Sequence, residues 1–572
     1  MKAIFFQAAL VLNFLSLVTA APFFTKVDSE TWIFGNELWN VTQKGKNAKP
    51  LYYKKKELVG NAQGHYYSSS NTTSDFTISS ASVVSEGEYK DTPYIDISLD
   101  CPAGEEHSVI FTGLAGAYQY FVNKGLSDQG EYRSLWRLDN TTFTHGKTGR
   151  KDEELPPLSW HTEETKVFDS TYLRPDGTYV TKYDFTSFLR GMEFYGTYGD
   201  GFGSWYINPG KDYYNGDHLR QELTVHREAV TGDTVQLNML HGTHFFRSIN
   251  DTIPVGKMWG PWLWYLNDGS QSDVEERAAA EFAAWPYSWL DNSDYQSRGS
   301  VSGSLVLSDG RPASYAAIFL GDSNSDTDTI RQGSTYYYTS YADESGNFEI
   351  DNVREGTYGL RAWSNGSSIA DVSTVFTQNK VVIASDKNSD LGTLKWALPD
   401  RERIWRVGDF DRTAYGFKVG GAPYAYGLTE LCSKNIDYVI GESQSSDWCY
   451  AQTKVGNWTI SFPVSTEVSS TRKPTLVISL AGWVSNASST VFVNDHEIGE
   501  LSGFTNDGAL YRSSTINGDW RYLEFPFDAE FLKLGDENTN KLTFQLYSNL
   551  GDGSALTTTQ RGAMFDAIAL DW

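Results

Sequence analysis

The sequence has few cysteines, few basic residues for its acidic content and little that could form a metal site. Three cysteines in 572 residues exclude a disulfide scaffold and a cysteine-rich metal centre. The 47 Lys and Arg residues stand against 72 Asp and Glu residues, which gives a formal charge of −25. Binding to nucleic acid or to an anionic membrane needs clustered basic side chains. We therefore expect no nucleic-acid partner and no membrane partner.

Long apolar runs are also missing, except at the N-terminus. Residues 3–18 form an apolar stretch after Met1-Lys2 and end at a small-x-small pattern. This is typical of a signal peptide and predicts cleavage after residue 20, with a mature chain from Ala21. The alternative, an N-terminal anchor, is disfavoured because the run is short and no basic flank follows it. We expect a secreted, extracellular protein.

Glycosylation signals and the three cysteines fit that compartment. Asn-X-Ser/Thr sequons occur along the whole chain. They are Asn40, Asn71, Asn140, Asn250, Asn365, Asn457 and Asn486. Cys432 and Cys449 enclose a short loop and are predicted to form a disulfide, which leaves Cys101 as a buried free thiol.

Recognisable catalytic motifs are scarce. The nine histidines are scattered, with no HExxH motif and no paired CxxC motif. His241 and His244 are three apart, which on a strand would place them on opposite faces, so we predict no metal site. A glycosidase needs two carboxylates, and the sequence does not single out any pair.

The pattern that is present is that of an all-β, multidomain chain. Short alternating segments such as residues 94–99 and 235–240 predict half-buried strands. Shifts in pattern divide the mature chain into a β domain over residues 21–297, a smaller β-sandwich over residues 298–398 and a jelly roll over residues 399–572.

One helix interrupts the strands of the first domain. Ser272 to Glu275 form a predicted capping box, an Ala-rich run continues to Ala284, and Pro286 ends the helix.

Residues 130–139 predict a strand with Arg133, Leu135 and Arg137 on one face. The two arginine Cα atoms would lie roughly 13 Å apart, so their guanidinium groups could converge on an acid. The alternative is a solvated strand face that pairs with local acidic residues.

Three further features carry possible chemistry. Lys182 stands between aromatic residues, and His241 follows an apolar run and precedes a glycine. A surface lysine and a structural histidine are the alternative interpretations. Trp259 and Trp262 belong to an aromatic segment. We expect some of its side chains to pack in the core and others to line a carbohydrate groove. Lys257 adds a positive charge to this segment.

Several of these segments together resemble polysaccharide lyase family 4, and within it the longer fungal rhamnogalacturonan lyases. The segments are residues 117–122, 131–140, 256–267, 333–338, 356–366, 404–411 and 446–449. The resemblance covers essentially the whole mature chain. It implies a large catalytic β-sandwich, a fibronectin-III-like β-sandwich and a jelly-roll, carbohydrate-binding-like domain, in agreement with the three blocks.

The resemblance also implies roles for single residues. Lys182 matches the catalytic base, His241 the catalytic acid, and Arg133 and Arg137 the arginines that bind the galacturonate carboxylate. Lys257 is the alternative base. No cofactor is required, and fold analogy suggests a structural calcium ion in the C-terminal domain, with Asp571 as a ligand.

The function implied is β-elimination at the α-1,4 rhamnose–galacturonate bond of rhamnogalacturonan I, which leaves an unsaturated galacturonate. This is the reaction of rhamnogalacturonan endolyases, and we expect a monomer that binds this polysaccharide. A glycoside hydrolase on the same polymer and a non-catalytic pectin-binding protein are the alternatives. The sequence leaves open endo or exo attack, tolerance of acetylation, and sugar binding by the third domain.

Overall fold

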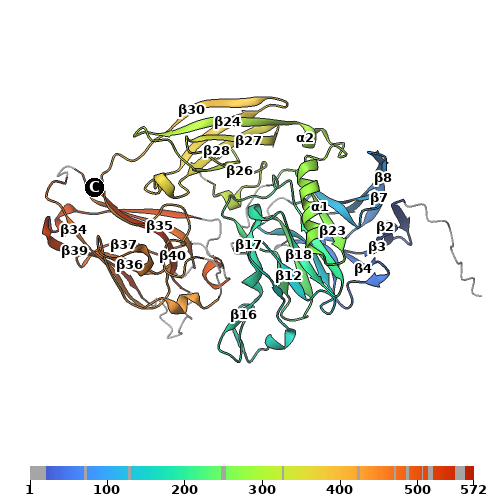
Figure 1. Cartoon of the computed structure of the whole chain (residues 1–572), viewed down its shortest axis with the longest axis horizontal. Helices are drawn as coiled ribbons and strands as arrows, with labels where there is room; N and C mark the ends of the chain where they lie inside the picture. Colours follow the sequence, from blue (N-terminus) through green and yellow to red (C-terminus); the bar gives the residue numbers. More distant parts are fainter. Residues whose placement is uncertain are drawn as a thin grey trace, which may run out of the picture.

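The structure, a computed structural model, belongs to the all-β class, as predicted (Figure 1). It describes residues 21–69, 74–126, 130–245, 253–324, 327–421, 426–468, 472–484, 488–504, 507–512, 514, 520–547 and 561–572. Its sheets fall into three groups along the chain, and no sheet of the described residues mixes strands from two groups.

Two nine-stranded antiparallel sheets make up most of the first group and pack face to face. The first sheet, here the site sheet, runs in the order β1 (Phe23–Lys26), β2 (Thr31–Gly35), β3 (Trp39–Lys44), β4 (Asn47–Tyr53), β6 (Gly64–Ser69), β11 (Tyr132–Leu138), β22 (Thr234–His241) and β21 (Val225–Arg227), with β5 (Lys56–Glu57) beside β4. The second sheet runs in the order β13 (Asp152–Glu154), β12 (His145–Lys147), β18 (Phe194–Gly199), β19 (Phe202–Ile207), β23 (Met258–Asn267), β10 (Gly116–Asn123), β9 (Gly104–Phe111), β8 (Thr92–Cys101) and β7 (Ser80–Tyr89).

Alternation along β11 decides what lies inside the sandwich and what lies outside it. Tyr132, Trp136 and Leu138 enter the core between the two sheets. Leu135 belongs to a separate apolar cluster on the other face, and that is the face on which Arg133 and Arg137 fall. The prediction that these three residues share a face is confirmed.

Strand β22 departs from its predicted half-burial, because all of its residues are buried. Its outward residues Val235 and Leu237 are covered by Tyr183 and Leu223. These two residues belong to the segment of the chain between β13 and β21. That segment carries two small sheets, β14 (Lys166–Phe168), β15 (Thr171–Leu173) and β16 (Tyr179–Thr181) in one, β17 (Thr186–Phe188) and β20 (Gln221–Leu223) in the other.

The predicted helix is α1 (Gln271–Ala284). Its N-cap is Ser270, whose side chain accepts a hydrogen bond from the amide of Asp273, so the capping box predicted at Ser272 is wrong. A short second helix, α2 (Ser293–Gln296), occupies part of the segment that follows.

The second group consists of two smaller sheets with one apolar core between them. One sheet holds β27 (Asn347–Arg354), β24 (Arg298–Leu307) and β30 (Asn388–Trp396), and the other holds β26 (Tyr338–Tyr341), β25 (Ala317–Gly321), β28 (Gly356–Trp363) and β29 (Phe376–Ile383).

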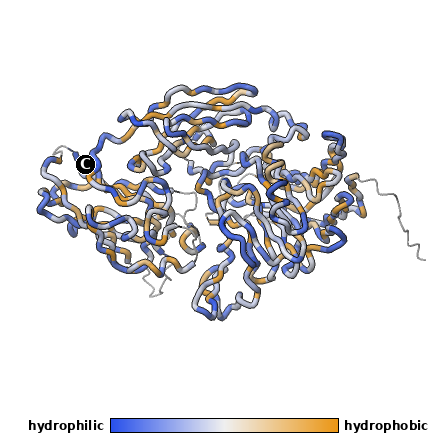
Figure 2. Tube along the Cα trace, viewed as in Figure 1, coloured by the Kyte–Doolittle hydropathy of each residue, from blue (hydrophilic) through white to orange (hydrophobic). Residues whose placement is uncertain are grey.

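The third group consists of two five-stranded sheets around the second large apolar core. One sheet holds β31 (Arg403–Gly408), β40 (Ala563–Asp571), β35 (Thr475–Trp483), β38 (Arg521–Pro526) and β33 (Ala451–Gln452), and the other holds β32 (Ile436–Val439), β34 (Gly456–Val464), β39 (Gly535–Leu546), β36 (Ser489–Val493) and β37 (His496–Leu501). Hydrophobic and hydrophilic residues are interspersed along the strands of all three groups (Figure 2).

We call the three groups the first, second and third domains, and their exact boundaries stay predictions. Cys432 and Cys449 form the predicted disulfide within the third domain. Cys101 is a buried free thiol, and burial raises its pKa to about 12. Within the described residues, no helix has both the length and the apolar content needed to cross a membrane.

Candidate active site

Lys182 is placed by a capped turn at the end of strand β16. It opens the 3-10 helix η3 (Lys182–Phe185). The Thr181 hydroxyl accepts a hydrogen bond from the Tyr183 amide, and the Asp184 carboxylate accepts one from the Thr181 amide (3.2 Å). This reciprocal cap fixes where the chain leaves the strand, and Lys182 with it.

The surroundings of Lys182 favour its neutral form. The side chain is partly buried, and its Nζ atom lies 5.1 Å from the centre of the Tyr183 ring. Burial lowers the pKa of Lys182; Asp169 and Glu228 oppose this effect, while the positive charges of Arg512 and Arg133 reinforce it. An amine with a lowered pKa is available as a proton acceptor closer to neutral pH.

Arg133 and Arg137 lie on the same face of β11 and are held by protein groups. Arg133 pairs with Glu131, and its Nε atom donates to the Ser68 hydroxyl (2.9 Å). Arg137 lies 3.2 Å from Glu228 and 3.4 Å from Asp233. Both interpretations of the arginine pair therefore retain support: Arg133 acts electrostatically on Lys182, Arg137 shares the neighbour Glu228 with it, and each arginine already has an acidic partner.

Three histidines come from β21, from the end of β22 and from the turn after it. His241 ends β22, is fully buried, and pairs in register with Tyr132, whose side chain lies in the core between the two large sheets. The Nδ1 atom of His244 lies 2.9 Å from Glu131 and 3.3 Å from Arg133. His226, on β21, lies 3.9 Å from Glu228.

Burial lowers the pKa of both His226 and His244 to about 4, although a neighbouring carboxylate opposes the shift in each case. Both rings also interact electrostatically with Lys182. They are therefore neutral at neutral pH.

The turn after β22 is built from buried polar residues. The Gly242 amide donates to Asn215 Oδ1 (3.0 Å), and its carbonyl accepts from the Arg220 guanidinium. The amide of His244 donates to Glu222 (2.8 Å), a carboxyl whose pKa burial raises to about 7. Gly242 has a φ of +70°, so the strand ends here and His241 and His244 are not two residues of one strand.

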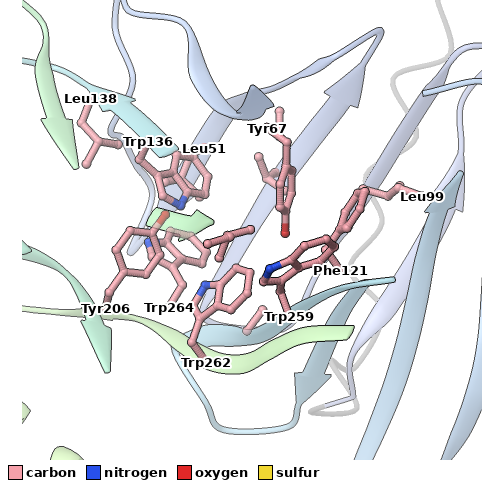
Figure 3. Packing of buried hydrophobic residues seen from close by; sticks show 14 of the residues in the cluster. Leu51, Tyr67, Leu99, Phe121, Trp136, Leu138, Tyr206, Trp259, Trp262 and Trp264 are labelled. Carbon is pink, nitrogen blue, oxygen red and sulfur yellow. The ribbon is translucent and has the colours of Figure 1, made fainter. Parts of the chain in front are cut away.

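Trp259 and Trp262 do not contact a substrate groove, which corrects the expectation drawn from their clustering. Both indoles are fully buried between the two large sheets, where they pack with Trp136 and Trp264 (Figure 3). A sugar cannot reach them there, and the aromatic richness of β23 serves the core.

Lys257 belongs to a different part of the molecule. Its Nζ atom donates to the Gly333 carbonyl (2.6 Å) and lies 3.2 Å from the Tyr337 hydroxyl, both in the second domain. It is buried at the contact between the first and second domains, so its surroundings differ from those of Lys182.

The calcium ion suggested for the third domain stays a prediction, and its suggested ligand Asp571 already binds a protein cation. Both carboxylate oxygens of Asp571 accept hydrogen bonds from Arg403. Among the residues that the structure describes, no three His, Cys, Asp or Glu side chains are grouped so as to hold a metal ion.

Of the predicted glycosylation sites, Asn365 and Asn457 are exposed, while Asn40 and Asn140 are partly buried. Asn71, Asn250 and Asn486 lie outside the described residues. Occupancy of each site stays a prediction.

Sequence reasoning missed the charged and histidine residues around Lys182 and Arg133. Glu131 had a signal, because it alternates with Arg133 on the same strand pattern. Asp169 and Arg512 had none, because they are 343 residues apart and meet only in the folded chain.

Comparison with known proteins identifies the family. Residues 288–391 and 403–570 match the domains described as polysaccharide lyase family 4, domain II and domain III. A rhamnogalacturonate lyase of Dickeya dadantii is 31% identical over 80% of this chain and 78% of that protein. The chain belongs to polysaccharide lyase family 4.

Fungal rhamnogalacturonate lyases are similar as well. Rhamnogalacturonate lyase B of Emericella nidulans is 25% identical over 82% of this chain and 80% of that protein. Identity with this fungal relative is lower than with the bacterial one, so the resemblance to the fungal enzymes is part of a wider likeness within family 4.

Proposed function

We propose that the chain is a secreted, pectin-degrading rhamnogalacturonan lyase that cleaves the α-1,4 rhamnose–galacturonate bond of rhamnogalacturonan I by β-elimination. The observation that carries this proposal is Lys182, a partly buried lysine of lowered pKa beside Arg133, on the outer side of the site sheet. Family membership and the names of the relatives support the class of substrate.

In the proposed reaction Lys182 removes the proton on C5 of the galacturonate. The electron pair forms the C4–C5 double bond, and the bond between C4 and the bridging oxygen breaks. A lysine must be neutral to act as this base, and the lowered pKa of Lys182 supplies more of that form. The uronate carboxylate binds at Arg133 and Arg137, whose charge stabilises the enolate-like intermediate.

His241 is the proposed acid that returns a proton to the leaving oxygen. His241 is fully buried in this conformation, so the proposal requires that substrate binding uncovers it.

The product spectrum tests the reaction class. The purified chain is incubated with rhamnogalacturonan I, and ultraviolet absorbance is followed while the products are sized by mass spectrometry. β-Elimination gives an absorbing unsaturated uronate at each new non-reducing end. Shortened products without new absorbance would indicate a hydrolase, and binding without shortening would indicate a non-catalytic protein; either result contradicts the proposal.

Secretion has its own test. Expression of the full chain in a secreting eukaryotic host, followed by N-terminal sequencing of the protein in the medium, should give a start at Ala21. Retention in the cell with residues 1–20 still attached would contradict it.

A further inference from the structure

Arg512 of the third domain reaches the surroundings of Lys182. It follows the 3-10 helix η9 (Ala509–Tyr511). Its Nε atom donates to Asp169 Oδ2 (3.1 Å), and its Nη1 atom donates to the carbonyl of His244. Its guanidinium carbon lies 5.3 Å from the centre of the Tyr183 ring. One side chain of the third domain therefore touches three residues around the candidate base.

The backbone around Arg512 is fixed to the first domain. The Gly508 amide donates to the Phe245 carbonyl (2.9 Å), and the Ser514 hydroxyl donates to the Gln221 side chain. A Cβ atom on Gly508 would come within 2.8 Å of the Arg512 side chain and 3.2 Å of the Phe245 carbonyl. This close approach needs a glycine, and it brings Arg512 to the site.

The charges that face Lys182 come from several elements. Asp169 lies in the turn between β14 and β15, Glu228 directly follows β21, and Arg133 and Arg512 supply positive charge. The neutral rings of His226 and His244 complete the set. Asp169 is first among the charges that favour protonated Lys182.

Asp169 is held by two donors. The Tyr183 hydroxyl donates to Asp169 Oδ2 (2.8 Å), beside the bond from Arg512. Burial alone would raise the pKa of Asp169, but Arg512 and Lys182 outweigh it and lower the pKa. The carboxylate therefore stays ionised, and after Arg512 the next cation that lowers its pKa is Lys182.

We propose that Arg512 is a positioning residue of the active site: it binds the Asp169 carboxylate, so that Asp169 does not form a full ion pair with Lys182. The third domain is then part of the catalytic machinery, besides any sugar binding of its own. The inference rests on the proposed role of Lys182 as the base.

The test is the pH dependence of kcat/KM for the full chain on rhamnogalacturonan I. In Arg512→Gln the Asp169 carboxylate no longer binds Arg512, so it interacts more strongly with Lys182 and raises the pKa of Lys182. The acidic limb of the pH–rate profile therefore moves to higher pH by about one unit. Activity then falls about tenfold on the acidic limb and recovers at higher pH. If the limb stays in place and only the plateau falls, Arg512 is merely structural and the proposal is overturned.

Four further variants, one of them a double mutant, sharpen the result. Arg512→Lys keeps the positive charge and should leave the limb near its wild-type position. Asp169→Asn should move the limb to lower pH, and Arg512→Gln should shift it much less in that background. Arg521→Gln, which removes another third-domain arginine that pairs across to Asp328 in the second domain, should not move the limb.

The outcomes separate the two proposals. If Arg512→Gln does not fold, the Asp169→Asn shift still decides: a limb that does not move contradicts the inference. If the wild-type chain forms no ultraviolet-absorbing product, the proposed function fails. If the wild-type chain forms that product but the acidic limb keeps its position in the Asp169 and Arg512 variants, only this inference fails.

Discussion

At the scale of single residues, the site is a balance of charges that the protein itself supplies. Arg133 pairs with Glu131, and Arg137 pairs with Glu228. Glu131 stays ionised because of the groups around it. Burial alone would raise the pKa of Glu131, but Arg133 and His244 hold it well below its usual range. In the proposed complex the substrate carboxylate would compete with protein carboxylates for the arginines, which favours a ligand that presents its charge in a fixed geometry.

Arg137→Lys tests this reading of the arginine pair. Lysine keeps the charge but cannot present the planar fork that matches a carboxylate. We expect kcat/KM on de-esterified rhamnogalacturonan to fall by about 10–100-fold. The measurement is the initial rate of ultraviolet absorbance.

Arg174→Lys is the matched control, because Arg174 pairs with the exposed Asp176 and stacks on Trp160 in the same domain. Methyl esterification of the substrate should mimic the loss. Unchanged turnover by Arg137→Lys would assign the pair a structural role only.

At the scale of elements, the end of β22 and the turn after it place the histidines. Gly242 has a φ of +70°, and a Cβ atom there would lie 1.5 Å from the carbonyl oxygen of Gly130. The close approach of two backbone segments thus sets the position of His241.

Gly242→Ala should lower the free energy of unfolding by about 3 kcal/mol or more, because it adds a backbone clash to the left-handed conformation. Gly256→Ala is the control: Gly256 has a φ of +85°, but nothing lies within 4 Å of its would-be Cβ atom. It should cost only about 1–2 kcal/mol. Equal shifts of the thermal midpoint in both variants would contradict the account.

Strands and their faces can be predicted from the sequence, because they follow from the local alternation of residues. The roles of single residues cannot be predicted where they depend on tertiary contacts. The face of β11 that carries Arg133 and Arg137 follows from alternation, and it is observed. The role of Trp259 and Trp262 was predicted wrongly because a dense run of aromatic residues is equally typical of a core and of a sugar groove. Only the packing of the site sheet over β23 shows that these two residues belong to the core. Arg512 and Asp169 could not be paired from sequence, because nothing local links them.

At the scale of the whole molecule, buried ion pairs join the domains. Asp212 of the first domain lies 3.2 Å from Arg298 and 2.9 Å from Arg354 of the second domain. All three side chains are buried. Removing the carboxylate would leave two buried cations uncompensated, which is far more costly than losing a surface pair.

Asp212→Ala should therefore destabilise the protein by about 3–5 kcal/mol. Asp400→Ala should change stability by less than about 1 kcal/mol, because its pair with Arg472 is exposed. Denaturant unfolding of the two variants measures the difference. Similar stabilities would show that the interdomain pair contributes no more than a surface contact.

The central claim, that Lys182 is the base of an elimination reaction, is tested most directly by comparing Lys182→Ala with Lys257→Ala in the ultraviolet assay across pH. Loss of a positioned proton acceptor costs about 10²–10⁴-fold. We predict this loss for Lys182→Ala, together with loss of the acidic limb, because a lysine base acts only above its pKa. Lys257→Ala, in the contact with the second domain, should keep the limb. Near-normal turnover by Lys182→Ala, with loss in Lys257→Ala, would contradict the account.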